Sequence, residues 1–130
     1  PASPFVAGFI GSPAMNMLTA QVAADGASIE LPGGTRINLG GKLEAREMTV
    51  GVRPEHLAVA AGGQGVFAIN VDIVEALGAD TLVHGRVGES ALLTARLPGT
   101  MNFTSGQRLA LTVTPDHLHL FDAAAGKRLN

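Results

Sequence analysis

Short segments in which apolar and polar residues alternate, each ended by turn residues, restrict the possible folds of this chain most. MNMLTAQVAA is followed by Asp25-Gly26, a pair that favours a tight β-hairpin turn, and ASIEL then leads back. Pro32-Gly33-Gly34 ends this segment, RINL follows, and Gly40-Gly41 ends that one. EMTVGVR stops at Pro54, which cannot donate a ladder hydrogen bond. These patterns predict short strands joined by tight turns.

The second half of the chain repeats this pattern after a glycine-rich joint, GGQG at 62–65. Its predicted strands are VFAINVDIVEAL, TLVHGRV, SALLTARL, RLALTVT and HLHLF. Turns separate them at Gly78-Ala79-Asp80, at Gly88-Glu89 and in PGTMNFTSGQ, and DAAAGKRLN is predicted to form a polar turn and tail. Strands that recur at a spacing of roughly 8 to 12 residues predict an all-β barrel or sandwich rather than an α/β fold.

The start of the chain has a different pattern, which favours one short helix. Ser3 can cap it, Pro4 suits the first helical position, and Gly11 would end it. Phe5 and Phe9 would then share one apolar face. Because a helix of so few residues is not stable alone in water, we expect it to dock on this domain or on another one.

Two parts are therefore expected, a connector helix at 1–12 and one small β domain at 13–130. Since the first residue is Pro1 rather than Met, we expect the chain to be a fragment or a processed form of a longer protein.

Composition excludes several classes of protein. Charged residues make up 15 % of the chain, below the roughly 25 % of an ordinary soluble domain, so we expect a partner to cover part of the surface. The formal net charge of −2 provides no field that would attract nucleic acid. With no cysteine, the chain has no disulfide, thiolate zinc site or cysteine nucleophile. No apolar run approaches the ~18 residues of a membrane span.

No phosphate-binding loop is present in the sequence. Such a loop needs a glycine, four residues, Gly-Lys and then Ser or Thr. Gly41-Lys42 has Arg36 at the position of the first glycine and Leu43 at the position of the hydroxyl. We therefore expect this chain not to bind ATP through such a loop.

Histidines do not form a predicted metal site. His117 and His119 would share one face of a strand, but a zinc ion needs further ligands, and Asp116 would face the other way. We interpret the pair as surface or half-buried histidines. His84 lies in the middle of a predicted strand and is interpreted as a packed or edge residue rather than a base.

Carboxylates do not form a predicted catalytic pair. Asp72 and Glu75 are expected on opposite faces of a strand, and Asp80 is expected in a turn, whereas a glycosidase needs two carboxyl groups that converge. No Ser, His and acid arrangement has the context of a nucleophile elbow. An enzyme is not expected.

GVRPEH at 51–56 is the most specific local motif after the start of the chain. Arg53 should be extended before Pro54, and the proline should begin a turn that projects Glu55 and His56. The motif is also compatible with an ordinary turn that carries a salt bridge, and its spacing does not separate the two interpretations.

Four segments in this order resemble one family: FVAGFIGSPAMN, VGVRPEHL, VEALGADTLVHGRV and HLHLFDAAAGKRL. They are similar to the C-terminal regulatory (TOBE) domain of the ATPases of ATP-binding-cassette importers for sugars and related carbon sources. The resemblance covers nearly the whole chain. Within the family, LGADTLVHGR is most similar to the glycerol-3-phosphate importers, with maltose and other oligosaccharide importers as near relatives.

The resemblance implies an OB-fold-like barrel that binds no nucleic acid, with 1–12 as the connector from a nucleotide-binding domain. It implies a non-catalytic regulatory and dimerisation domain, with no cofactor of its own, whose longer parent binds ATP and magnesium and hydrolyses ATP. Implied partners are a second copy, the chain's own nucleotide-binding domain, transmembrane permease subunits and a carbon-status signalling protein, at the cytoplasmic face of a bacterial membrane. The regulatory or interface candidates are Phe5, Phe9, Gly51, Arg53, Glu55, His56 and Glu75.

A small-ligand-binding barrel that senses oxyanions or sugars is the alternative interpretation. Arg53, His56 and Arg86 could supply its polar groups. A nucleic-acid-binding barrel is less favoured, because its bases would need aromatic side chains to stack on, and this chain has five scattered Phe and neither Tyr nor Trp. A regulatory domain should present a broad self-complementary face, whereas a sensor should present polar groups that converge in a cleft.

Overall fold

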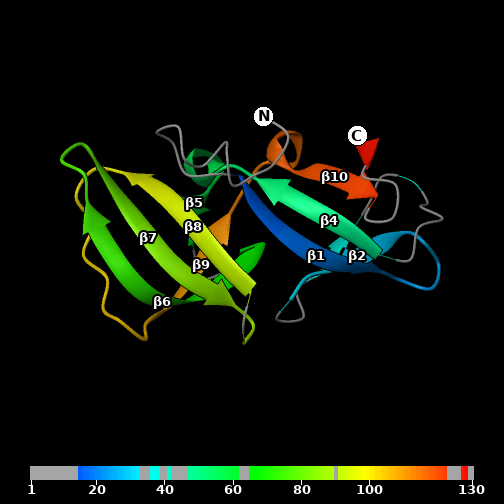
Figure 1. Cartoon of the computed structure of the whole chain (residues 1–130), viewed down its shortest axis with the longest axis horizontal. Coiled ribbons are helices and arrows are strands. Elements are labelled where there is room, and N and C mark those ends of the chain that lie inside the picture. The colour runs from blue at the N-terminus through cyan, green and yellow to red at the C-terminus, as the bar shows by residue number, and fades with distance from the viewer. Residues whose placement is uncertain are drawn as a thin grey trace.

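A computed structural model describes residues 15–32, 36–38, 41, 47–61, 65–89, 91–122 and 127–128. In this part of the chain two curled antiparallel sheets lie side by side (Figure 1). The first sheet has the order β11-β10-β4-β1-β2-β3 and the second β5-β9-β6-β7-β8. No helix among the described residues is long and apolar enough to cross a membrane.

The first sheet consists of β1 (Asn16–Val22), β2 (Ser28–Glu30), β3 (Arg36–Asn38), β4 (Glu47–Val52), β10 (His119–Asp122) and β11 (Lys127–Arg128). The second sheet consists of β5 (Ala58–Val59), β6 (Phe67–Ala76), β7 (Asp80–Val87), β8 (Ala91–Pro98) and β9 (Arg108–Thr112). The 3-10 helix η1 (Pro54–His56) follows β4 and precedes β5. The 3-10 helix η3 (Pro115–His117) follows β9 and precedes β10. The all-β, OB-like fold class expected from the sequence is confirmed.

Alternation produces the strands as predicted. In β1, Leu18 and Ala20 are buried while Met17 and Thr19 are exposed, because successive side chains of a strand point to opposite faces. The turn after β1 is stabilised by Asp25, whose carboxylate accepts a hydrogen bond of 2.9 Å from the backbone N–H of Ala27.

Two similar segments carry the chain from one sheet to the other. VRPEHL at 52–57 takes the chain from β4 in the first sheet through η1 to β5 in the second. VTPDHL at 113–118 takes it back, from β9 through η3 to β10. Because β4 pairs with β10 and β5 pairs with β9, the two crossovers lie against each other and tie the sheets together.

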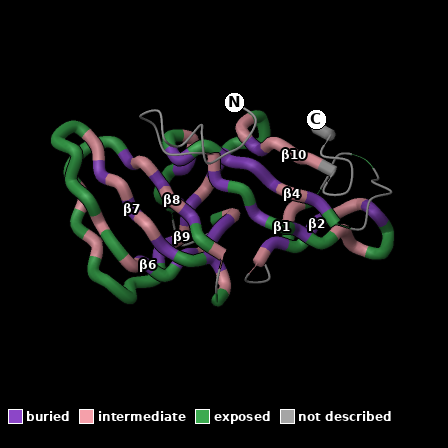
Figure 2. Tube along the Cα trace, viewed as in Figure 1, coloured by how far each residue is buried: buried purple, intermediate pink, exposed green. Residues whose placement is uncertain are grey.

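A single hydrophobic core lies between the sheets. Figure 2 shows the buried stretches along the facing strands of both sheets. Met48 and Val50 of the first sheet and Phe67 and Ile69 of the second belong to the same cluster of buried side chains. Among the described residues, both sheets therefore contribute to one shared core.

The buried side chain of Asn16, at the start of β1, joins the first sheet to the edge strand β8 of the second sheet. The Asn16 amide donates to the carbonyl oxygen of Thr94, and the Asn16 oxygen accepts from the N–H of Thr94, both at 2.8 Å. Asn16 therefore satisfies the outward backbone groups in the middle of β8, the edge strand of the second sheet. Pro98, two residues beyond Arg96 on the same edge, has no N–H to satisfy.

The structure differs from the sequence prediction at several points. His117 does not share a strand face with His119, because Pro115 begins a 3-10 turn that ends before β10. The final residues are not only a turn and tail, because β11 pairs with β10, with Lys127 opposite Asp122. The two-residue strand β5 was not predicted either. The expected connector helix at 1–12 lies outside the described residues.

We predict that Asn16→Ala lowers the free energy of unfolding by about 1–3 kcal/mol, because the N–H and C=O of Thr94 lose their partner in a partly buried place. Urea denaturation followed by circular dichroism measures the change. Gln21→Ala is the control, since Gln21 lies on the same strand and makes an exposed bond to Glu47. Equal stability of the two variants would contradict the role given to Asn16.

Candidate functional site

The outer face of the second sheet combines charged and apolar side chains from three adjacent strands. We define this outer face by Asp72, Ile73 and Glu75 of β6, Asp80, Leu82, His84 and Arg86 of β7, and Leu92, Thr94 and Arg96 of β8. The opposite side of these strands forms part of the core.

A β-bulge places both carboxylates of β6 on this face. Val71 pairs with Gly85, but Ile73 pairs with His84, so β6 contains one extra residue at Asp72. The extra residue shifts the alternation, and Asp72 and Glu75 both reach side chains of β7 on the outer face. The expectation that they face opposite sides of the strand is therefore wrong.

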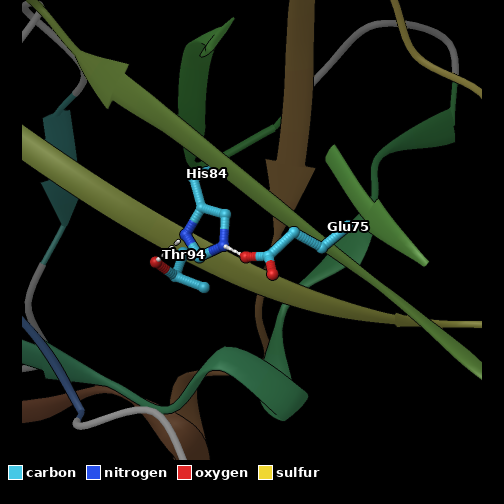
Figure 3. Close-up of polar contacts among 3 residues, drawn as sticks. All are labelled: Glu75, His84 and Thr94. Carbon is cyan, nitrogen blue, oxygen red and sulfur yellow. Dashed lines mark hydrogen bonds and ion pairs between the residues drawn. The ribbon is translucent and has the colours of Figure 1, made fainter. Parts of the chain in front are cut away.

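Glu75, His84 and Thr94 form a chain of hydrogen bonds across β6, β7 and β8 (Figure 3). The Nε2 of His84 lies 2.6 Å from Oε1 of Glu75, and its Nδ1 lies 3.0 Å from Oγ1 of Thr94. If Nε2 carries the proton and donates it to the carboxylate, Nδ1 accepts the hydroxyl proton of Thr94. The chain then fixes all three side chains.

These three side chains follow the order of an acid, a base and a hydroxyl, as in enzymes with an activated nucleophile. Such enzymes stabilise the developing oxyanion with free N–H donors close to the nucleophile. The backbone N–H of Thr94 is already donated to Asn16. We therefore interpret Glu75, His84 and Thr94 as a cross-strand brace.

Other charges of the outer face are also paired. Arg86 donates from Nε and Nη2 to the two carboxylate oxygens of Asp72, each at 3.1 Å. This hydrogen bond and the charge of Asp72 raise the pKa of Arg86 above its ordinary value. Arg96 Nε lies 2.7 Å from Asp80. Exposed ion pairs of this kind add little to the stability of the fold. We therefore expect their main effect to be that they hold the charged side chains in defined positions on the outer face.

Two shallow grooves lie on either side of Leu92, which is 72 % exposed. One groove, of about 370 Å³, is lined by Ile73 and Leu93 together with the braced polar side chains. The other, of about 440 Å³, lies between Leu92, Met17 and Pro32. Ile73 is 59 % exposed and faces the first groove. Leu92 therefore forms a ridge with a hollow on each side.

The two crossover turns form a second candidate surface. The imidazoles of His56 in η1 and His117 in η3 stack with centroids 3.7 Å apart and an angle of 14° between the rings. Oγ1 of Thr114 lies 3.1 Å from Nδ1 of His117. Arg53 and Glu55 are exposed beside this stack. Among the described residues, no three metal-ligating side chains converge here or elsewhere.

Gly51 contributes to this region through packing. It is buried in β4, and a Cβ added to it would lie 2.5 Å from the sulfur of Met15 and 3.2 Å from the ring of Phe121. The missing side chain of Gly51 therefore leaves room for Met15 and Phe121, and Gly51 itself is not exposed.

The structure gives the predicted interface residues three different locations. Arg53, Glu55 and His56 lie together on the exposed crossover turn, with Gly51 buried nearby. Glu75 lies on the outer face. Phe5 and Phe9 lie outside the described residues. His84 is half-buried in the middle of β7, where its ring lies between Glu75 and Thr94.

Sequence reasoning missed Leu92 and the partner of His56. Leu92 belongs to an alternating strand, but only the strand pairing shows which of its faces is covered. The repeat VRPEHL and VTPDHL was a visible signal that the two turns are counterparts.

Comparison with known proteins shows the family to which this chain belongs. A sequence model of the TOBE domain matches residues 50–121, more than half of the chain, and a model of the MalK OB fold domain matches residues 11–57. The chain belongs to the TOBE domain family. The matched segment includes both crossover turns and all of the outer face.

Curated relatives include the sn-glycerol-3-phosphate import ATP-binding protein UgpC of Escherichia coli (strain K12), which is 46 % identical over 132 residues. The proteins of the same name from Escherichia coli O157:H7 and Shigella sonnei (strain Ss046) are also 46 % identical. Each alignment covers 99 % of this chain and 37 % of the relative, so the chain spans little more than a third of the length of these proteins. The family resemblance of the four sequence segments is confirmed.

For this TOBE domain we predict that Gly85→Ala lowers the free energy of unfolding by about 1–3 kcal/mol, because a Cβ there would lie 2.5 Å from the backbone oxygen of Asn70 beside the bulge. Gly41→Ala is the matched control, since nothing lies within 4 Å of its Cβ. Thermal unfolding of both variants tests the prediction. A stable Gly85→Ala protein would show that the bulged strand can move away.

Proposed function

We propose that this chain is the non-catalytic regulatory domain of the ATP-binding subunit of an ATP-binding-cassette importer for glycerol-3-phosphate or a related sugar. The observation that carries the proposal is the 46 % identity over 99 % of the chain to proteins named as sn-glycerol-3-phosphate import ATP-binding proteins. The TOBE and OB-fold matches, which together extend from residue 11 to residue 121, support the same assignment.

In this proposal the chemistry of ATP hydrolysis belongs to another part of the longer protein. ATP and magnesium bind in a nucleotide-binding domain that precedes residues 1–12, and those residues, with Phe5 and Phe9, connect it to the barrel at 13–130. That nucleotide-binding domain contacts the permease subunits at the cytoplasmic face of the bacterial membrane. This chain contributes by tethering and regulating the nucleotide-binding domains. A non-catalytic role of this kind agrees with the side chains of its outer face, which are bonded to one another.

Two kinds of contact are proposed for the barrel. It pairs with a second copy of itself and so tethers two nucleotide-binding domains. A carbon-status signalling protein docks at the crossover turn, where Arg53 and Glu55 are exposed and His56 stacks on His117. Gly51 acts there through packing, and Glu75 acts through the brace with His84.

The small-ligand sensor is less well supported by the geometry. An oxyanion site needs a free cation, but the Arg86 guanidinium is bound by both oxygens of Asp72. Glu75 and Asp72 line the adjacent groove, and their charge would oppose an oxyanion there. The three candidate residues of that interpretation, Arg53, His56 and Arg86, are divided between η1 and β7.

We predict that this chain binds no ATP–magnesium complex at micromolar concentration. Isothermal titration calorimetry of the 130-residue chain measures this directly, with a chain extended by its N-terminal nucleotide-binding domain as the positive control. Micromolar binding by the isolated chain would contradict the assignment as a regulatory domain.

A double change at the crossover turn tests the proposed docking surface. We predict that Glu55→Ala with His56→Ala leaves the circular dichroism of the barrel unchanged but alters dimerisation, or the coupling of ATP hydrolysis to transport, in the full-length protein. The reason is that Glu55 is exposed and the half-buried His56 ring stacks on His117, while neither side chain belongs to the hydrophobic core. Ser105→Ala, in an exposed turn of another loop, is the control.

If dimer mass, ATPase activity and transport all equal those of the control, the motif has only the structural role of a turn.

A further inference from the structure

We propose that Met17 is a site of reversible oxidation by small peroxides, and that its sulfoxide, formed beside Met15 and Phe121, loosens strand β10. Met15 directly precedes β1 and Met17 lies in it, so the site belongs to the first sheet. A modification of this kind goes beyond the proposed role of the chain in transport and does not depend on it.

The sulfur atoms of both methionines lie over Gly51 of β4. Met17 is paired with Gly51 in the ladder of β1 and β4, so its side chain lies on the same face of the sheet as the missing side chain of Gly51. A Cβ built on Gly51 would lie 2.5 Å from the sulfur of Met15 and 3.3 Å from the sulfur of Met17. The same point lies 3.2 Å from the ring atom Cε2 of Phe121. Two thioethers thus gather at the edge of an aromatic ring, which is a favourable contact.

Phe121 connects this contact to the return crossover of the chain. It lies in β10, which follows η3, and it is paired with Thr49 of β4. β10 has four residues, and β11 on its other side has two, so β4 is its main partner in the sheet. The contact of the half-buried Phe121 ring with the thioethers adds side-chain packing to this short ladder. A polar group at the sulfur would therefore weaken the attachment of β10.

Exposure distinguishes the four methionines of the chain. Met17 is 42 % exposed and lines the open groove beside Leu92, whereas Met48 is fully buried in the core. Met15 and Met101 are half-buried. Because a thioether has no proton to lose before it reacts, access to the sulfur decides which methionine a peroxide reaches first. Met17 is the most accessible of the four.

The reaction transfers one oxygen atom and two electrons. A lone pair of the Met17 sulfur attacks one oxygen of the peroxide, the O–O bond breaks and an S–O bond forms. The attacked oxygen passes its proton to the other oxygen, which leaves as water from hydrogen peroxide or as an alcohol from an alkyl peroxide. The thioether is oxidised and the peroxide is reduced. The resulting sulfoxide is polar, which disrupts an apolar contact, and methionine sulfoxide reductases can reverse it.

Graded treatment of the 130-residue chain with hydrogen peroxide, followed by tandem mass spectrometry of its peptides, tests the site. We expect Met17 to be half oxidised at a peroxide dose at least about tenfold lower than Met48, because only the sulfur of Met17 is readily reached. Met48 is the buried control within the same chain. Oxidation of Met48 or Met101 before Met17 would overturn the proposal.

Hydrogen exchange of β10 tests the consequence of the modification. At a dose that oxidises Met17 alone, we expect the amides of His119–Asp122 to exchange about two- to tenfold faster, because a sulfur–aromatic contact is lost from a short ladder. Repair by a mixture of the two methionine sulfoxide reductases should restore the slow exchange.

Two leucine variants identify the methionine that is responsible, each compared with its own untreated sample. Met17→Leu should abolish the response of β10 to peroxide, since leucine has a similar volume and no sulfur. Met101→Leu is the matched control and should leave the response unchanged. Unaltered exchange of β10 in a chain oxidised at Met17 would overturn the proposal. A Met17→Leu chain that still responds to the same dose would overturn it too, since another methionine would then be responsible.

Discussion

Exchange of the chain between the two sheets is the constraint on which the rest of the structure depends. β4 leaves the first sheet through η1 and β9 leaves the second through η3, and the four flanking strands pair with one another as β4 with β10 and β5 with β9. The two sheets are therefore joined by two crossovers of the chain and by the shared core, while every backbone ladder lies within one sheet. The stacked rings of His56 and His117 mark the place where the two crossovers meet.

This arrangement leaves the outer face of β6 to β8 as a surface that other contacts can use. The inner sides of these strands are buried against the first sheet, and the edge of β8 is satisfied in its middle by Asn16. The bulge at Asp72 and the close approach at Gly85 then decide which side chains reach the outer face. Only 15 % of the residues are charged, and several of these form ion pairs on the outer face. The apolar side chains of Ile73 and Leu92 are exposed on the same face.

Most of the strands could be predicted because alternation and turn residues act locally. The Asp25-Gly26 turn and the breaks at Gly78 and Gly88 lie where the sequence placed them, and these glycines have positive φ angles of 73°, 85° and 68°. Features that depend on pairing could not be predicted. The bulge at Asp72 is defined only by the partner strand, so the faces of Asp72 and Glu75 were assigned wrongly. β5 and β11 are two residues long and too short for any alternation to be visible.

The crossover turns and the outer face are neighbours in the fold, which gives the proposed regulation a physical route. η1 packs against β8, the strand that carries Leu92, Thr94 and Arg96. Thr94 in turn binds Asn16 through its backbone and His84 through its side chain, so one residue of β8 links both sheets and the brace. A displacement of η1 would therefore act directly on β8 and, through Thr94, on His84 and Glu75. Such a change needs no pathway across the core, because η1 contacts β8 and β8 carries Thr94 of the brace.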